Sequence, residues 1–150
     1  VYQNYCNQLN IDSSKIKSIE KIPFLPISFF KYHKVISSQK KIKKTFISSG
    51  TTGTKSYHYI TDLNLYEKSI KSCFNTFYGD SSLYAFLGIT PKPIEKPNSS
   101  LIYMINFFIK NSIYSDSSFV NSAEDLKAKS SYFEKKKYKI YSLWTILLFN

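Results

Sequence analysis

Apolar residues recur along the chain with two different periods, and the shorter period predicts five strands. Alternation of apolar and polar residues, or a short apolar run bounded by turn residues, is typical of a β-strand. Such segments occur at residues 45–48 (TFIS), 56–61 (SYHYIT), 82–89 (SLYAFLGI), 118–121 (SFVN) and 138–149 (YKIYSLWTILLF). We expect the first two to flank a turn, because a glycine-containing segment lies between them.

The longer period, of three to four residues, predicts a first helix that starts after Thr61 or Asp62. Gly79 follows it at the position of a helix C-cap. Its expected apolar stripe consists of Leu63, Tyr66, Ile70, Cys73, Phe74 and Phe77.

Two further helices are predicted in the second half of the chain. One is capped by Ser99 or Ser100, and its inward-facing residues are Leu101, Met104, Ile105 and Phe108. The other starts at Ser122, with Asp125 completing a capping-box-like pair, and ends near Phe133. Strands that alternate with helices imply an α/β fold with a mostly parallel sheet flanked by helices.

The first 44 residues carry a weaker pattern. Residues 1–20 are polar and weakly periodic, and residues 22–30 (IPFLPISFF) contain two prolines, which exclude a regular helix from the first half of that segment. The lysine-rich residues 37–44 are typical of a solvated connector.

The net charge of the chain adds little to the interpretation of fold and partners. The chain has 150 residues, enough for one domain, and a formal net charge of +11. A net charge of this size and sign is typical of proteins that bind nucleic acids or acidic membranes. All 21 basic residues are lysine, however, and the guanidinium fork that reads bases and phosphates is missing. We therefore expect no nucleic-acid partner, and the final apolar run is too short to span a bilayer.

The two cysteines, Cys6 and Cys73, show no metal-binding spacing, so no metal site is predicted within the chain. Two thiols in a chain of this size favour a reducing compartment, and hence a cytoplasmic location. Cys73 falls on the apolar stripe of its helix, where we expect a small buried residue.

The glycine-containing segment SSGTTG, at residues 48–53, is the main candidate for chemistry. A Walker loop would need glycine at positions 49 and 54, which hold Ser49 and Thr54, so that motif is excluded. Gly50 and Gly53 allow a tight turn with exposed amides, and the hydroxyls around them are donors for a phosphate. The same hexapeptide also suits an ordinary hairpin turn, and both interpretations remain open on pattern alone.

Three segments in order carry a family resemblance: residues 22–37 (IPFLPISFFKYHKVIS), 48–70 (SSGTTGTKSYHYITDLNLYEKSI) and 98–109 (NSSLIYMINFFI). Together they resemble the acyl-protein synthetase family (LuxE type), which is related to phenylacetate–CoA ligase within the adenylate-forming superfamily. The resemblance runs from about Lys21 to the chain end. It implies the N-terminal part of the large adenylate-forming domain, incomplete at its C-terminal end.

The resemblance also implies a function. A fatty or aromatic carboxylic acid and ATP would give an acyl-adenylate, and the acyl group would pass to a protein cysteine thiol and from there to a partner such as a reductase. His58 is a further candidate by its spacing, although a strand histidine more often packs or hydrogen-bonds. The ATP-phosphate residues implied are Ser48, Ser49, Gly50, Thr51, Thr52, Gly53 and Lys55.

The remaining machinery of the family is expected outside this sequence. The Mg²⁺ ligand, the late catalytic lysine and the acceptor cysteine would lie beyond Asn150, and the chain alone is expected to be inactive. Residues 83–96 (LYAFLGITPKPIEK) depart from the family's usual apolar-then-proline segment, with Gly88 where a more typical loop-forming residue is expected, which leaves substrate choice open. Alternatives are an acyl- or aryl-CoA ligase, a non-catalytic lysine-rich anion-binding fragment, and a degenerate remnant without activity.

Overall fold

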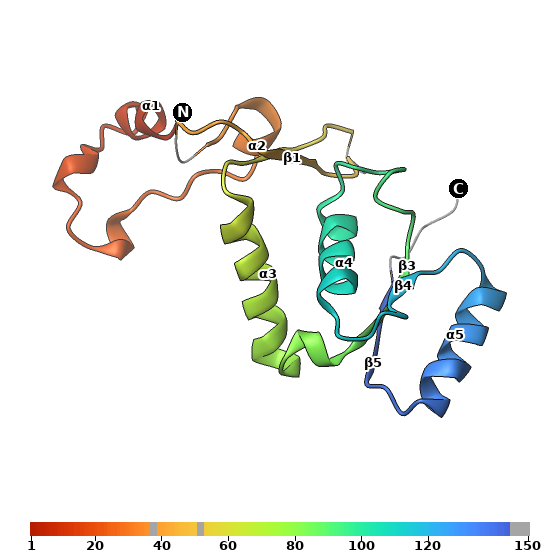
Figure 1. Cartoon of the computed structure of the whole chain (residues 1–150). Coiled ribbons are helices and arrows are strands. Elements are labelled where there is room, and N and C mark those ends of the chain that lie inside the picture. Colours follow the sequence, from red (N-terminus) through yellow and green to blue (C-terminus); the bar gives the residue numbers. More distant parts are fainter. Residues whose placement is uncertain (37–38, 51–52, 145–150) are drawn as a thin grey trace. The chain divides into compact units, whose positions relative to one another are not determined.

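The fold is described from a computed structural model, which covers residues 1–36, 39–50 and 53–144, with the backbone path alone for residues 140–144. The chain divides into two compact units, Val1–Asp62 and Leu63–Asn150. Figure 1 shows the elements of both units along the chain.

The first unit contains short helices followed by a hairpin. The hairpin pairs β1 and β2 in antiparallel register, with Phe46 opposite His58. Both strands were predicted, whereas helix α1 was not, because residues 1–20 show only a weak period. The elements are α1 (Tyr2–Gln8), η1 (Ser13–Lys15), η2 (Ile19–Lys21), α2 (Phe29–Tyr32), β1 (Lys44–Ile47) and β2 (Tyr57–Ile60).

Aromatic contacts hold the irregular part of this unit together. The Tyr2 hydroxyl donates a hydrogen bond of 2.7 Å to the carbonyl of Pro23. The rings of Tyr5 and Phe29 meet edge to face at 5.2 Å between centroids, a geometry that adds about 0.5–1.5 kcal/mol to the area they bury. Helix α1 therefore holds the proline-containing segment, residues 22–30, near both ends of that segment.

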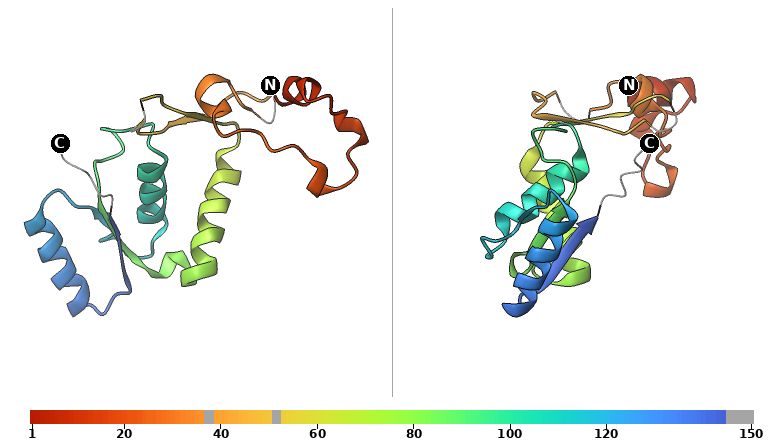
Figure 2. Two further views of the ribbon diagram at one scale, coloured as in Figure 1. Left: turned by 180° about the vertical axis from the view of Figure 1, so that it is seen from behind. Right: turned by 90° about the vertical axis from the view of Figure 1, so that its right-hand side faces the viewer.

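The second unit is an α/β layer structure. Its sheet has the order β4-β3-β5, and β3 is parallel to both neighbours. Figures 1 and 2 show this sheet between α4 on one face and α5 on the other. The elements are α3 (Leu63–Tyr78), η3 (Ser81–Leu83), β3 (Ala85–Ile89), α4 (Ser100–Asn111), β4 (Ser118–Phe119), α5 (Ala123–Lys135) and β5 (Ile140–Trp144).

Strand β3 supplies both halves of the core. Successive side chains of a strand point to opposite faces, so a central strand covered on both sides is apolar throughout. Phe86 packs with residues of α3 and α4 on one face. Ala85 and Leu87 pack with Phe133 of α5 and with Val120 on the other. The continuous apolar run at 85–89 is explained by this double burial.

Helices α3 and α4 are joined by a polar contact as well as by the core. The Tyr103 hydroxyl donates a hydrogen bond of 2.5 Å to Oε1 of Glu67. Burial, this hydrogen bond and the negative charge of Glu67 raise the pKa of Tyr103 to about 12. The predicted caps are confirmed, since the hydroxyls of Ser99 and Ser122 accept from backbone amides of α4 and α5.

Two expectations for the fold need correction. Cys73 is exposed, not buried, and Phe77 is also exposed. Helix α3 faces the core through Ile70 and Phe74, and the residues at the edge of the predicted stripe are rotated away from it. The sheet structure is also less uniformly parallel than expected, because the strands around the glycine segment form a separate antiparallel hairpin.

Gly88 has a packing role in the middle of β3. A Cβ atom at this position would lie 2.7 Å from Cγ2 of Ile105 and 2.9 Å from Cδ1 of Phe119. Real Cβ contacts of this length do not occur without displacement of the neighbours, so glycine lets helix α4 and strand β4 approach β3 closely. The unexpected glycine therefore reflects close packing in the core.

We expect Gly88→Ala to destabilise the chain by about 1–3 kcal/mol, the usual cost of an overpacked core. Gly79→Ala is a matched glycine substitution, since Gly79 has a φ of +83° and a Cβ added there would have no described atom within 4 Å. Its cost comes from backbone conformation alone, about 1–2 kcal/mol. Urea unfolding measures the free energy of unfolding of both variants, and Ile105→Ala should cost less stability in the Gly88→Ala background than in the wild type or in Gly79→Ala. An Ile105→Ala effect that is equal in all these backgrounds would contradict the steric account.

The raised pKa of Tyr103 predicts a pH dependence of stability. A folded-state pKa of about 12, above an unfolded value of about 10, means that the contribution of Tyr103 is complete below pH 10 and is lost as the pH rises toward 12. The stability difference between wild type and Tyr103→Phe should therefore shrink over this interval. Glu67→Gln should narrow the interval by lowering the pKa of Tyr103. A difference that stays constant to pH 12 would contradict the assignment.

Candidate functional site

The segment between β1 and β2 is closed at its base by two serines. The backbone amide of Ser48 donates to the carbonyl of Ser56 at 3.0 Å. The amide of Ser56 donates to the side-chain Oγ of Ser48 at 2.8 Å. These two bonds fix the ends of the segment at residues 48–56, which we call the glycine loop. Because the Ser48 hydroxyl accepts in this bond, its own proton can still be donated to a further acceptor.

Both glycines of the loop adopt backbone conformations that other residues rarely reach. Gly50 has a φ of +70° and Gly53 a φ of +94°. The amide of Gly53 donates to the carbonyl of Gly50 at 2.8 Å, which makes a tight turn inside the loop. Glycine at two nearby positions is therefore required by the turn itself.

One part of the sequence interpretation is wrong in detail. The pattern predicts that the two glycines expose amides of the loop to a phosphate, but the Gly53 amide is not available, because it makes the hydrogen bond that closes the turn. The side-chain donors of this region are its hydroxyls and the Lys55 ammonium.

Lys55 folds back over the turn. A Cβ atom on Gly50 would lie 2.8 Å from Cγ of Lys55, so the lysine side chain occupies the space that a larger residue at position 50 would fill. Ser48, Ser49 and Lys55 are exposed. The structure thus brings Ser48, Gly50 and Lys55 together in one loop, whereas Thr51 and Thr52 lie outside the described residues.

His58 has a packing role in the structure. Its ring stacks on Phe30 with centroids 4.6 Å apart and planes 13° from parallel, and it lies opposite Phe46 in the hairpin register. The stack attaches the hairpin to α2. Of the two interpretations of His58, these contacts support the packing one.

Ser56 is the loop residue that sequence reasoning missed. The alternating pattern places it only at the start of a strand, and its bonds to Ser48 show that it closes the loop. A signal for this role was present, because hydroxyl residues stand at both ends of the glycine segment.

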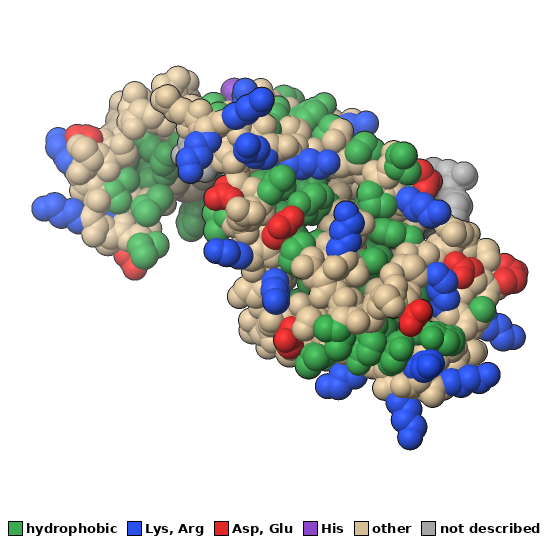
Figure 3. Space-filling view, viewed as in Figure 1, with side chains coloured by type: hydrophobic (Ala, Val, Ile, Leu, Met, Phe, Trp, Pro, Cys, Tyr) green, Lys and Arg blue, Asp and Glu red, His purple; other side chains and the backbone are tan. Residues whose placement is uncertain are grey.

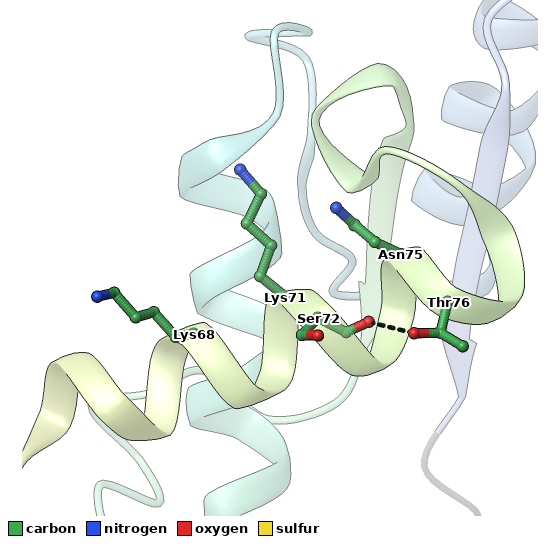
Figure 4. Close-up of a pocket in the computed structure, with 5 residues that line it drawn as sticks. All are labelled: Lys68, Lys71, Ser72, Asn75 and Thr76. Carbon is green, nitrogen blue, oxygen red and sulfur yellow. Dashed lines mark hydrogen bonds between the residues drawn. The ribbon is translucent and has the colours of Figure 1, made fainter.

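A second polar region lies on the outer face of α3 (Figure 4). It is a shallow, open hollow of about 490 Å³, lined by Lys68, Lys71, Ser72, Asn75 and Thr76. The Thr76 hydroxyl donates to the carbonyl of Ser72 at 2.9 Å, a bond within the helix. All five residues belong to one solvent-facing helix surface, so this hollow does not enclose a ligand.

The described residues contain no candidate metal centre beside the loop. Across the residues with described positions, no group of three or more His, Cys, Asp or Glu could hold a metal ion. On the face shown in Figure 3, lysines are dispersed over much of the surface with carboxylates among them. Over residues 1–36, 39–50 and 53–144, no helix has both the length and the apolar character needed to cross a bilayer.

Comparisons with known proteins identify relatives for the part of the chain that contains the loop. The family model described as "Acyl-protein synthetase, LuxE" matches residues 1–76, just over half of the chain. A stretch of 56 residues is 39% identical to the "Long-chain-fatty-acid--luciferin-component ligase" of Photorhabdus luminescens, covering 37% of this chain and 47% of that protein. The match thus spans about half the length of that relative. No solved structure matches the chain.

We expect His58→Ala to lower stability by about 1 kcal/mol through loss of the ring stack, and His58→Phe to retain most of it. Thermal unfolding followed by circular dichroism measures this difference. If His58 instead supplied a proton or a hydrogen bond to a ligand, His58→Phe would fold normally and lose ligand binding. That combination would contradict the packing role.

Proposed function

The chain belongs to the acyl-protein synthetase family, and from this premise we propose that it activates a long-chain fatty acid with ATP. The carboxylate would attack the α-phosphorus of ATP to form an acyl-adenylate and release pyrophosphate. The acyl group would then pass to a protein cysteine thiol, with release of AMP. Support comes from the family match over residues 1–76, which includes the glycine loop, and from the relative named as a fatty-acid ligase.

The observation that carries this proposal is the geometry of the glycine loop. Its base is fixed by the Ser48–Ser56 hydrogen bonds and its turn by the positive φ angles of Gly50 and Gly53. Because the loop ends and both glycines are already positioned, Ser48 needs less ordering when the ligand binds, which lowers the entropic cost of binding. Phosphate oxygens are acceptors, and hydroxyl and ammonium groups are donors suited to them.

Each residue of the loop has a defined part in this proposal. Ser48 and Ser49 donate hydroxyl protons to the β- and γ-phosphate oxygens, and Lys55 adds a positive charge. Gly50 leaves room for the Lys55 side chain to lie over the turn. Thr51 and Thr52, which lie outside the described residues, are assigned to the same phosphates by the resemblance alone.

The family also implies Mg²⁺ with ATP, but the described residues do not fit that ion. No cluster of carboxylates, histidines or cysteines lies close enough together to hold it in this part of the structure. No step of the proposal therefore runs through the metal. The loop's contribution is limited to binding and orienting the phosphates.

Neither cysteine is assigned as the acyl acceptor. Cys6 is fully buried, so a thiol there cannot reach an acyl-adenylate without local unfolding. Cys73 is exposed on helix α3, and because the resemblance implies an acceptor cysteine elsewhere, it is not proposed for this role. We propose that the acceptor thiol, and a reductase that would receive the acyl group, are outside the described residues.

ATP binding to the chain tests the loop. We expect Gly50→Ala and Lys55→Ala each to raise the Kd for ATP about tenfold, because the first displaces Lys55 and adds backbone strain and the second removes a charge. Gly79→Ala and Lys68→Ala are matched controls, because they change a positive-φ glycine and an exposed lysine of the second unit. Equilibrium dialysis with labelled ATP measures all four variants.

The same experiment distinguishes the alternatives. Equal weakening by the loop variants and by their controls would mean non-specific attraction of an anion to a lysine-rich surface, and would contradict the phosphate role of the loop. Pyrophosphate should displace ATP and AMP should not, because the proposed contacts are to the β- and γ-phosphates.

A further inference from the structure

Residues 22–28, which we call the proline loop, present large apolar side chains to solvent. Phe24 is 92% exposed and Ile27 is 79% exposed. Ile22 in the same loop is also exposed, and so is Ile19 just before it. Single exposed apolar residues are common on proteins, but a run of them within one short segment marks an interaction surface.

The proline loop is held in place at both ends. The Tyr2 hydroxyl binds the carbonyl of Pro23 at 2.7 Å. Phe29, just after the loop, meets the ring of Tyr5 at 5.2 Å. Pro23 and Pro26 restrict the backbone between these two anchors. Phe24 and Ile27 therefore project from a constrained loop and do not belong to a free tail.

The charges around this loop are unevenly distributed. The first unit, residues 1–62, contains ten lysines and three carboxylates. Lys17 and Lys21, close to the loop in the chain, are exposed. Glu20 lies beside them, and Asp12 pairs with Lys15 at 3.4 Å, so two of the three carboxylates reduce this local charge without cancelling it.

We propose that the proline loop binds the surface of a membrane that contains anionic lipids, with Phe24 and Ile27 inserted at the interface. Apolar side chains buried at the boundary of the acyl chains, together with lysines near the headgroups, are the chemistry that such a surface recognises. An acidic protein with an apolar patch is the alternative occupant of such a surface, and the vesicle experiment decides between the two. This inference does not rest on the proposed ligase activity.

Vesicle co-sedimentation of the 150-residue chain tests the proposal. We expect binding to phosphatidylserine-containing phosphatidylcholine vesicles, and much weaker binding to phosphatidylcholine alone or at high salt. The double variant Phe24→Ser/Ile27→Ser should lower the partition coefficient about tenfold or more, because both inserted side chains are lost. The matched control Phe77→Ser/Ile94→Ser changes residues that are 74% and 87% exposed in the second unit and should alter binding less than about twofold.

Three outcomes would overturn the proposal. The first is equal binding of the two double variants. The second is a marked fall in the melting temperature of Phe24→Ser/Ile27→Ser, which would mean that protein covers these side chains. The third is self-association of the wild type that this variant abolishes, which would make a second copy the occupant. Loss of folding of the double variant counts as the second outcome. Lys17→Glu/Lys21→Glu tests the electrostatic part separately and should weaken binding to anionic vesicles only.

Discussion

Two hydrogen bonds between Ser48 and Ser56 determine what the glycine loop can do. They close the hairpin just beyond the last pair of its register, Ile47 with Tyr57, so the residues between them form a loop with fixed ends. Inside that closure, the turn needs positive φ at Gly50 and Gly53, and the space over Gly50 is taken by Lys55. The Ser48 hydroxyl, the Lys55 side chain and the turn glycines thus lie together in one loop.

Much of the fold follows from local signals in the sequence. The strands at 44–47, 57–60 and 85–89 and the caps Ser99 and Ser122 agree with prediction, because alternation and capping chemistry are local properties. The rotation of a helix about its axis, by contrast, depends on contacts with elements that are distant in sequence. The apolar stripe places Cys73 on the wrong side of α3, because the direction of burial is set by the partners of Ile70 and Phe74, which are distant in sequence.

The position of the glycine loop between two strands was predictable from the sequence, but its hydrogen bonding was not. The glycine spacing and the surrounding hydroxyls located the loop. The use of the Gly53 amide inside the turn, and the closing role of Ser56, depend on pairing across the hairpin. The glycine at position 88 could not be explained from the sequence either. The side chains that take the space of a Cβ atom there, Ile105 and Phe119, come from other elements.

The central claim is that the glycine loop binds the terminal phosphates of ATP. Amide and side-chain chemical shifts measured by NMR during an ATP titration test it most directly. The account predicts saturable shifts at Ser49, Gly50 and Lys55 with ATP and with pyrophosphate, and none at these residues with AMP. Shifts confined to Lys68, Lys71 and Thr76 on helix α3, with the loop unaffected, would contradict it.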